Sequence, residues 1–169
     1  MEAEGLIDLG ATITLTSSGR TLAERVVRRH RLAERFLTDV LGLSWADAHT
    51  EAGKWEHVIS EPVEVALSRV LGDPTTCPHG NPIPGADYHA PNATSLSAIA
   101  IGSDFTVTRI PEELEFEPGM LAFLEENSLQ PGHSGTLTAL SPDGTATVEI
   151  EGRHVGIGRF ASDRILVTA

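Results

Sequence analysis

Apolar residues in the first forty positions change from strand-like to helical spacing. Residues 6–16 (LIDLGATITLT) alternate apolar and polar positions around Gly10, which predicts two short strands joined by a turn. Between residues 20 and 41 the apolar residues recur every three or four positions, the spacing of one face of a helix. Gly42 follows, where a C-terminal cap is expected.

Short polar side chains mark the starts of these helices. Thr16 or Ser17 can cap the first, because a hydroxyl oxygen satisfies backbone N–H groups that lack a helical partner. Ser44 with Asp47 three residues later forms a capping pair and predicts a second helix over 45–59.

A third helix and a proline-rich segment complete the N-terminal half. Ser60 and Pro62 open the helix, which carries an apolar face as far as Leu71. Residues 72–95 contain five of the ten prolines and no helical period, which predicts a linker.

The remaining residues, 96–169, predict a small β-rich domain, because short alternating segments are separated by turn residues. The expected strands are AIAIG, FTVTRI, GTLTAL, TATVEIEG, RHVGIG and RILVTA. One helix, over about 119–128, interrupts them, and an SH3-like barrel fits this strand count.

Charge and composition narrow the function. The net charge is −12, yet residues 1–42 hold six arginines against six acids, so the deficit belongs wholly to residues 43–169. This polarity suits a protein that contacts DNA only through its N-terminal end. No apolar run is long enough for a membrane helix, and the first ten residues lack the basic and apolar regions of a signal peptide. The single cysteine, Cys77, fits a reducing compartment. A cytoplasmic protein is expected.

Two predicted helices carry possible metal ligands on one face each. His30 and Glu34 are four residues apart and point to the same side. The stripe on the second helix consists of His49, Gly53, Glu56 and His57. Facing helices that present imidazole and carboxylate groups can bind a metal, and this donor set suits Fe, Mn, Co, Ni or Zn better than Ca.

The alternative is a solvated helix face, which is the ordinary meaning of an HxxxE pair. Titratable groups at coherent positions on two adjacent helices weigh against it, because burying them unpaired is costly. Other candidates are expected to be structural: the two tryptophans in the core, Cys77 an ordinary free cysteine, and the other histidines at the surface. These residues are Trp45, Trp55, His79, His89, His133 and His154.

Three blocks, RTLAERVVRRHRLAERFL, HTEAGKWEHVISEPVE and GNPIPG, resemble the diphtheria-toxin-repressor and iron-dependent-regulator family in order and spacing. The resemblance covers nearly the whole chain and thins after residue 95. It implies an α+β protein with four parts. They are the end of a winged helix (1–19), a helical metal-binding and dimerisation domain (20–72), a Pro-rich linker (73–95) and an SH3-like domain (96–169).

The resemblance also implies two metal sites. His30, Glu34 and His49 match an ancillary site that barrel residues complete, and the matching PEELE segment offers Glu112 and Glu115. Glu113 or Glu117 can substitute for these two.

Glu56 and His57 match the primary, regulatory site of the family. Gly53 stands where relatives place cysteine or another ligand side chain, and a glycine offers only its backbone carbonyl. A thiolate position is thus replaced by space that water can fill, which favours harder metals.

A second departure concerns DNA. The opening MEAEGL resembles the end of a recognition helix and LIDLGATITLT resembles a wing, so most base-reading residues are absent from this sequence. An internal methionine taken as the start, a deliberate shortening and a natural truncation all remain open as explanations.

The function expected from these features is an Fe²⁺- or Mn²⁺-dependent repressor of metal-homeostasis genes, acting as a homodimer. Zn, Co or Ni can substitute for the metal, and operator DNA binding is expected to be weak or absent. The alternative is a metal-binding dimerisation module that no longer binds DNA. A metal-dependent hydrolase is disfavoured, because nothing marks a placed base beside a substrate cleft.

Overall fold

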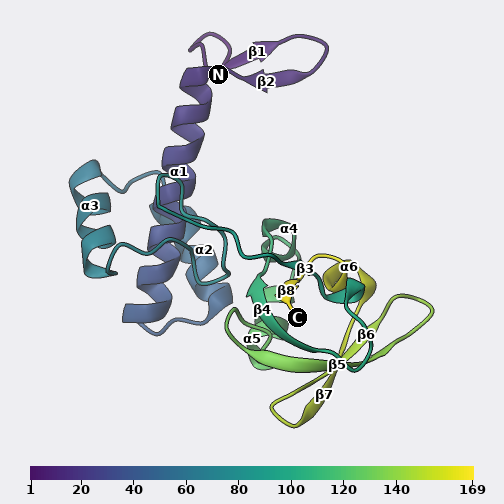
Figure 1. The fold of residues 1–169 in the computed structure, drawn as a ribbon. Coiled ribbons are helices and arrows are strands. Elements are labelled where there is room, and N and C mark those ends of the chain that lie inside the picture. Colours follow the sequence, from purple (N-terminus) through teal and green to yellow (C-terminus); the bar gives the residue numbers. More distant parts are fainter.

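The computed structural model describes residues 1–169, which form a helical part and a β-rich part packed together (Figure 1). The combination of helices with a separate antiparallel sheet confirms the predicted α+β class. None of the helices combines the length and apolarity that a bilayer crossing requires.

The chain opens with a two-stranded antiparallel hairpin, β1 (Ile7–Leu9) and β2 (Ile13–Leu15), as predicted. Helix α1 (Ser17–Arg35) follows immediately, so the hairpin sits at the tip of a long rod (Figure 1). Thr16 caps α1: its side chain accepts a hydrogen bond from the Gly19 backbone N–H at 3.0 Å. The hairpin is therefore joined to α1 without a flexible spacer.

The rod continues past α1 as one turn of π-helix, Phe36–Val40. The predicted cap follows, since Gly42 has φ +70° and its N–H bonds the carbonyl of Thr38. A π turn inserts one extra residue into the helical repeat. Here it accompanies the turn of Leu37 into the core shared by the helices.

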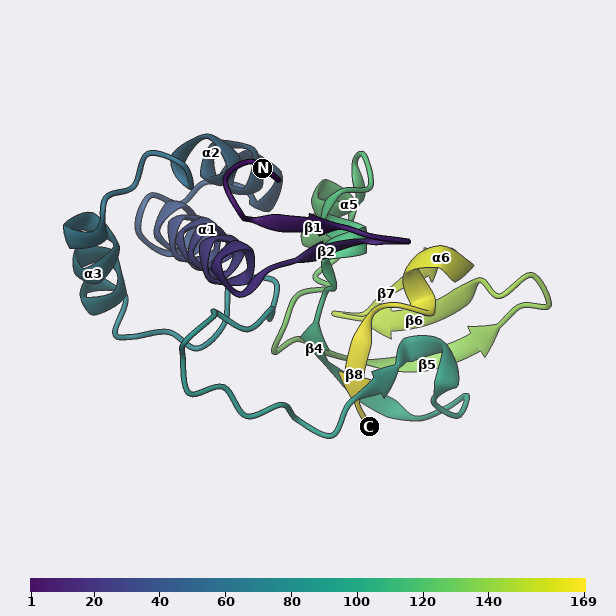
Figure 2. The ribbon, with the colours of Figure 1, turned by 90° about the horizontal axis from the view of Figure 1, so that it is seen from above.

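Helices α2 (Trp45–Trp55) and α3 (Glu61–Val70) pack beside α1 (Figure 2). The Ser44–Asp47 capping pair forms as predicted. Helix α2 ends four residues before the predicted end at Ile59. Ile59 is buried between the helices, so the chain turns inward there before the next helix begins.

The first half of the Pro-rich segment packs against α1. Three arginines of α1 donate hydrogen bonds to backbone carbonyls of this segment: Arg28 to Pro84, Arg31 to Pro82 and Arg35 to Thr76. Backbone carbonyls outside helices and strands need such partners when they are covered. The predicted linker therefore packs against the helical part on the far side of the predicted boundary at residue 72. The domain limits themselves stay predictions.

The β-rich part is a six-stranded antiparallel sheet in the order β3-β8-β4-β5-β6-β7. Its strands are β3 (Thr94–Ser95), β4 (Asp104–Arg109), β5 (Ser134–Leu140), β6 (Ala146–Ile150), β7 (Arg153–Ile157) and β8 (Leu166–Thr168). Short helices α4 (Glu112–Glu115), α5 (Met120–Glu126) and α6 (Arg159–Ser162) fill the connections, and η2 (Leu96–Ala98) is a single 3-10 turn.

One predicted strand, AIAIG at residues 98–102, is wrong. The chain leaves the sheet after Ser95, and Leu96 is anchored in the core with its N–H bonded to the carbonyl of Ile165. Ile101 is exposed and Gly102 has φ +87°, so this segment turns instead of pairing. Apolar alternation over five residues was too short to separate a strand from a turn.

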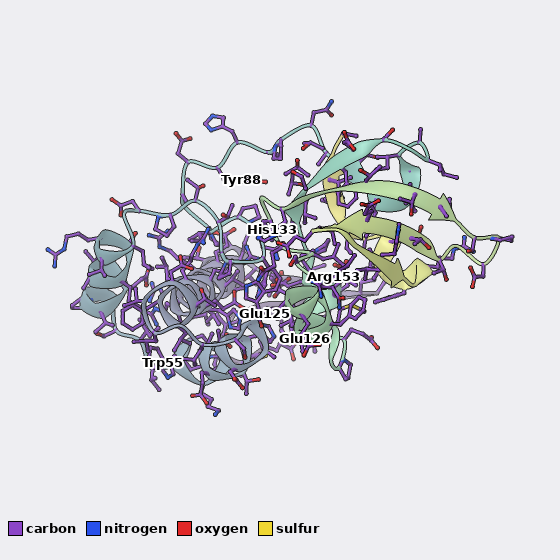
Figure 3. The ribbon with its side chains drawn as sticks, turned by 90° about the horizontal axis from the view of Figure 1, so that it is seen from below. Trp55, Tyr88, Glu125, Glu126, His133 and Arg153 are labelled. Atoms are coloured by element: carbon purple, nitrogen blue, oxygen red, sulfur yellow. The ribbon has the colours of Figure 1, made fainter.

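The two parts share one hydrophobic contact surface. Trp45 of α2 is buried in the core of the β-rich part, as its predicted core role requires. Its backbone N–H bonds the Glu125 carboxylate of α5 at 3.0 Å, and Figure 3 shows Glu125 on α5 between the helices and the sheet. The first turn of α2 is therefore fastened to the β-rich part, which corresponds to the predicted SH3-like barrel and is called the barrel below.

The backbone of the Pro-rich segment lies very close to the sheet at Gly80. Its φ is +82°, and a Cβ there would lie 2.3 Å from the carbonyl oxygen of Thr108. Gly102 has φ +87° with open space around it. We expect Gly102→Ala to lower the free energy of unfolding by about 1–2 kcal/mol through backbone strain alone. Gly80→Ala adds the clash and should lower it clearly further. Urea unfolding of the metal-free proteins measures both values, and equal losses would refute the close approach.

Candidate metal centre

Glu34 lies at the middle of a buried polar cluster. It projects from α1 one turn after His30, and its side chain is 1% exposed. Its Oε1 lies 3.0 Å from His30 Nε2 and 2.8 Å from His49 Nδ1 of α2. The two imidazoles are themselves 3.3 Å apart. The helical spacing read from the sequence thus places His30, Glu34 and His49 within reach of one ion.

The turn after α3 adds two groups that the sequence analysis assigned elsewhere. His79, expected at the surface, is 1% exposed, with Nδ1 3.6 Å from Glu34 Oε1. Cys77, expected to be an ordinary free cysteine, is also buried, and it forms a second possible ligand set with Glu34 and His79. Cys77 and His79 are two residues apart, a spacing that the sequence analysis did not use, and the packing of this turn against α1 brings both to Glu34.

Of the four acids in the PEELE region, Glu115 enters the cluster. It is buried, with Oε1 3.1 Å from His79 Nδ1 and Oε2 3.8 Å from His49 Nδ1. Glu112 is half exposed and pairs with Arg31 at 3.3 Å. Glu113 and Glu117 are exposed. Glu115 is buried and Glu112 and Glu113 are exposed because only one side of the short helix α4 faces the cluster.

The second predicted set is more open. Glu56 bridges His30 Nδ1 at 2.7 Å and His57 Nε2 at 3.0 Å, and the His57 side chain is 67% exposed. Gly53 borders a cavity of about 410 Å³ that also touches Glu112. A Cβ at Gly53 would meet no atom within 4 Å. The missing side chain therefore leaves space beside these groups.

Electrostatics favour the charged forms of Glu34 and His30. Burial raises the pKa of Glu34, but hydrogen bonds from His30 and His49 and nearby histidine charge outweigh it and lower the pKa to about 2. Burial lowers the pKa of His30, yet its contacts with Glu34 and Glu56 raise it overall. Both ring nitrogens of His30 face carboxylates, which only accept, so the imidazolium satisfies both. Burial, with Glu34 and Glu115 nearby, raises the pKa of the Cys77 thiol.

Three buried atoms test whether these residues suit a cation. Glu34 Oε2 and both ring nitrogens of His79 have no hydrogen-bond partner, although His79 Nδ1 approaches two carboxylates. Buried polar atoms normally have partners, and leaving one unsatisfied costs about 1–3 kcal/mol. Carboxylate oxygens and imidazole nitrogens turned toward one small volume are donors for a divalent transition metal. The residues fit such an ion.

Comparison with known proteins points the same way. Residues 16–85 match the family described as iron dependent repressor, metal binding and dimerisation domain. The iron-dependent repressor IdeR of Mycobacterium leprae (strain TN) is 39% identical over 167 residues, which covers 91% of this chain and 72% of that protein. The diphtheria toxin repressor of Corynebacterium diphtheriae is 51% identical over 89 residues, covering 52% of this chain and 39% of that protein.

Solved structures share the whole fold. A manganese-dependent transcriptional repressor in complex with manganese is 36% identical with a TM-score of 0.83, covering 99% of this chain and 79% of that chain. ScaR with bound Zn²⁺ is 28% identical with a TM-score of 0.73, covering 98% and 83%. These relatives are repressors, in agreement with the prediction of a regulator and not an enzyme.

The raised pKa of His30 has a consequence for metal-free protein. The stability that its protonation contributes is fully present below the unfolded value near pH 6.5 and is lost as pH rises through the higher folded value. We expect His30→Gln to remove this part of the pH dependence, which sets in as pH rises above about 6.5. Urea midpoints in chelator measure it. His89→Gln, at an 85% exposed side chain, is the control and should keep the wild-type slope. An unchanged slope in His30→Gln would contradict the assignment.

Proposed function

The chain belongs to the iron-dependent repressor family, and from this premise we propose that it is a metal-dependent transcriptional regulator. The observation that carries the proposal is the buried cluster around Glu34, where a carboxylate oxygen and both His79 nitrogens lack partners. Relatives are named for iron or manganese, and we assign Fe²⁺ or Mn²⁺ to this protein, with Zn, Co or Ni as substitutes.

We assign the ligands as two overlapping sets around Glu34. His30, Glu34 and His49 form the set that the helices supply. Cys77 and His79 join Glu34 from the other side, and Glu115 borders both sets. Glu112 could join only by leaving Arg31. The Cys77 thiol can bind a metal only after it loses its proton. The resulting thiolate is a soft ligand, which favours softer metals on that side.

A bound divalent cation supplies positive charge that links carboxylates from separate elements. The groups around Glu34 come from α1, α2, the 77–81 turn and α4. Before binding, His30 holds a proton between Glu34 and Glu56, and this proton must leave when the imidazole becomes a ligand. Metal affinity should therefore fall at low pH.

Helix α1 connects the cluster with the hairpin β1–β2. The hairpin stands at the N-terminal end of the same rod that carries the cluster (Figure 1). We assign the hairpin as a DNA wing, whose placement changes when metal selects one arrangement of α1 against the barrel. Operator DNA is the partner we assign to this end.

A homodimer would place two hairpins for two half-sites. Large apolar side chains are exposed on α3 and just before it, and we assign this helix to the dimer contact. They are Val58, Val63, Val65 and Val70. Fluorescence anisotropy of labelled duplex with and without Mn²⁺ separates a DNA-binding regulator from a metal-binding dimer that does not contact DNA.

Metal titration tests the ligand assignment. We expect His30→Ala, His49→Ala and His79→Ala each to weaken Mn²⁺ binding by at least about tenfold, because each removes a nitrogen donor from the cluster. His133→Ala, at a partly exposed histidine near Glu151, is the control and should bind like wild type. Calorimetry gives affinity and stoichiometry per chain. Equal affinities in all four variants would exclude this cluster as the metal site.

Gly53 offers a gain-of-function test of the Glu56–His57 set. We expect Gly53→Cys to bind one further Co²⁺ per chain, since the open cavity admits a thiolate beside Glu56. Gly53→Ala should keep the wild-type stoichiometry and raise the free energy of unfolding by about 1 kcal/mol, because it removes a mid-helix glycine without a clash. Absorption and calorimetric titrations report the stoichiometry. An unchanged count in Gly53→Cys would remove the second site from the proposal.

A further inference from the structure

Asn81 is a buried polar residue at the end of the turn that carries Cys77 and His79. Its side chain is enclosed, with the residue 1% exposed. The amide nitrogen donates to the carbonyl of Ile110 at 2.8 Å and to Glu115 Oε1 at 2.6 Å. The amide oxygen accepts from Arg109 Nε at 2.7 Å. Three partners, all in the β-rich part, thus engage one side chain from the Pro-rich segment.

Arg109 decides which way the amide faces. A guanidinium group only donates, so the oxygen of Asn81 must face Arg109. The two N–H groups are then directed at the two acceptors, the Ile110 carbonyl and the Glu115 carboxylate. The orientation is set by donor and acceptor chemistry, because a flipped amide would oppose donor to donor and acceptor to acceptor.

This arrangement divides the two oxygens of Glu115 between different tasks. Oε1 accepts the bond from Asn81 and lies 3.1 Å from His79 Nδ1. Oε2 makes no bond to Asn81 and lies 3.8 Å from His49 Nδ1. A neutral amide holds the carboxylate without adding a positive charge that would compete with a cation. Glu115 is therefore restrained while it keeps its charge for the cluster.

The backbone of the turn is fastened to the same segment. The N–H of Ile110 bonds the carbonyl of His79 at 2.8 Å, and the N–H of Cys77 bonds the carbonyl of Asn81 at 2.9 Å. Asn81 therefore closes a loop that holds His79 and Glu115 in a fixed relation. Buried amide and carboxylate neighbours of this kind orient metal ligands in proteins.

We propose that Asn81 is a positioning residue of the metal centre, which acts by orienting Glu115. The proposal rests on the metal-binding function proposed above. Asn81 touches no cation itself in this role, and its effect on affinity passes through Glu115. Arg109 fixes the orientation of the Asn81 amide by donating a hydrogen bond to its oxygen.

Calorimetric titration of Mn²⁺ into the full chain tests this role. We expect Asn81→Ala to weaken binding by about 10–100-fold relative to wild type. Thr108→Val is the matched control: it removes a different side-chain hydrogen bond of β4, to the Leu166 carbonyl at 3.0 Å, and should bind like wild type. Urea unfolding of the metal-free forms verifies that each variant is folded under the titration conditions.

A double-mutant cycle separates positioning from general support of the fold. If Asn81 acts through Glu115, then Asn81→Ala should change the affinity of Glu115→Ala by less than about twofold. Full additivity of the two substitutions would overturn the positioning role. Wild-type affinity in Asn81→Ala would also overturn it while leaving the metal-binding function intact. Failure of wild type to bind Mn²⁺ would overturn both proposals together.

Discussion

The burial of the Glu34 carboxylate near the C-terminal end of α1 is the constraint around which the molecule is arranged. An ionised carboxylate removed from water is stable only if positive or donating groups surround it. His30 lies one turn earlier on the same helix, His49 comes from α2 and His79 from the turn after α3. Each of these elements must pack against α1 for the charge to be compensated. The polar cluster and the hydrophobic packing of the helices therefore depend on each other.

Helix α1 performs three tasks because its faces are chemically different. One face carries His30 and Glu34 toward the cluster. Another carries Arg28, Arg31 and Arg35, whose guanidinium groups hold carbonyls of the Pro-rich segment. The N-terminal end carries the hairpin. Because α1 is one continuous helix, a displacement of its end at the cluster can be transmitted to the hairpin through the helix itself.

The barrel is joined to the helices by contacts that surround the same cluster. Trp45 packs into the barrel core and lies edge-on to the His79 ring, with centroids 4.4 Å apart. Glu125 holds the start of α2, and Asn81 holds Glu115 beside His79. Apolar packing and buried hydrogen bonds thus converge where the proposed metal ligands meet. Ligand geometry and the relative placement of the two parts are set by the same few side chains.

The sequence by itself determined the features that depend on local spacing. Helical periodicity gave α1 to α3 and the common face of His30 and Glu34, and hydroxyl caps gave the helix starts at Thr16 and Ser44. Alternation gave most strands, but it failed at residues 98–102, where core anchoring of Leu96 outweighed local preference. Only the tertiary structure decided that His79, Cys77 and Asn81 belong to the cluster and that Glu115 enters it while Glu112 pairs with Arg31. The physical reason is that an irregular turn has no period: its side chains acquire a direction only when Gly80 lets the backbone lie against β4 and the arginines of α1 fix its carbonyls.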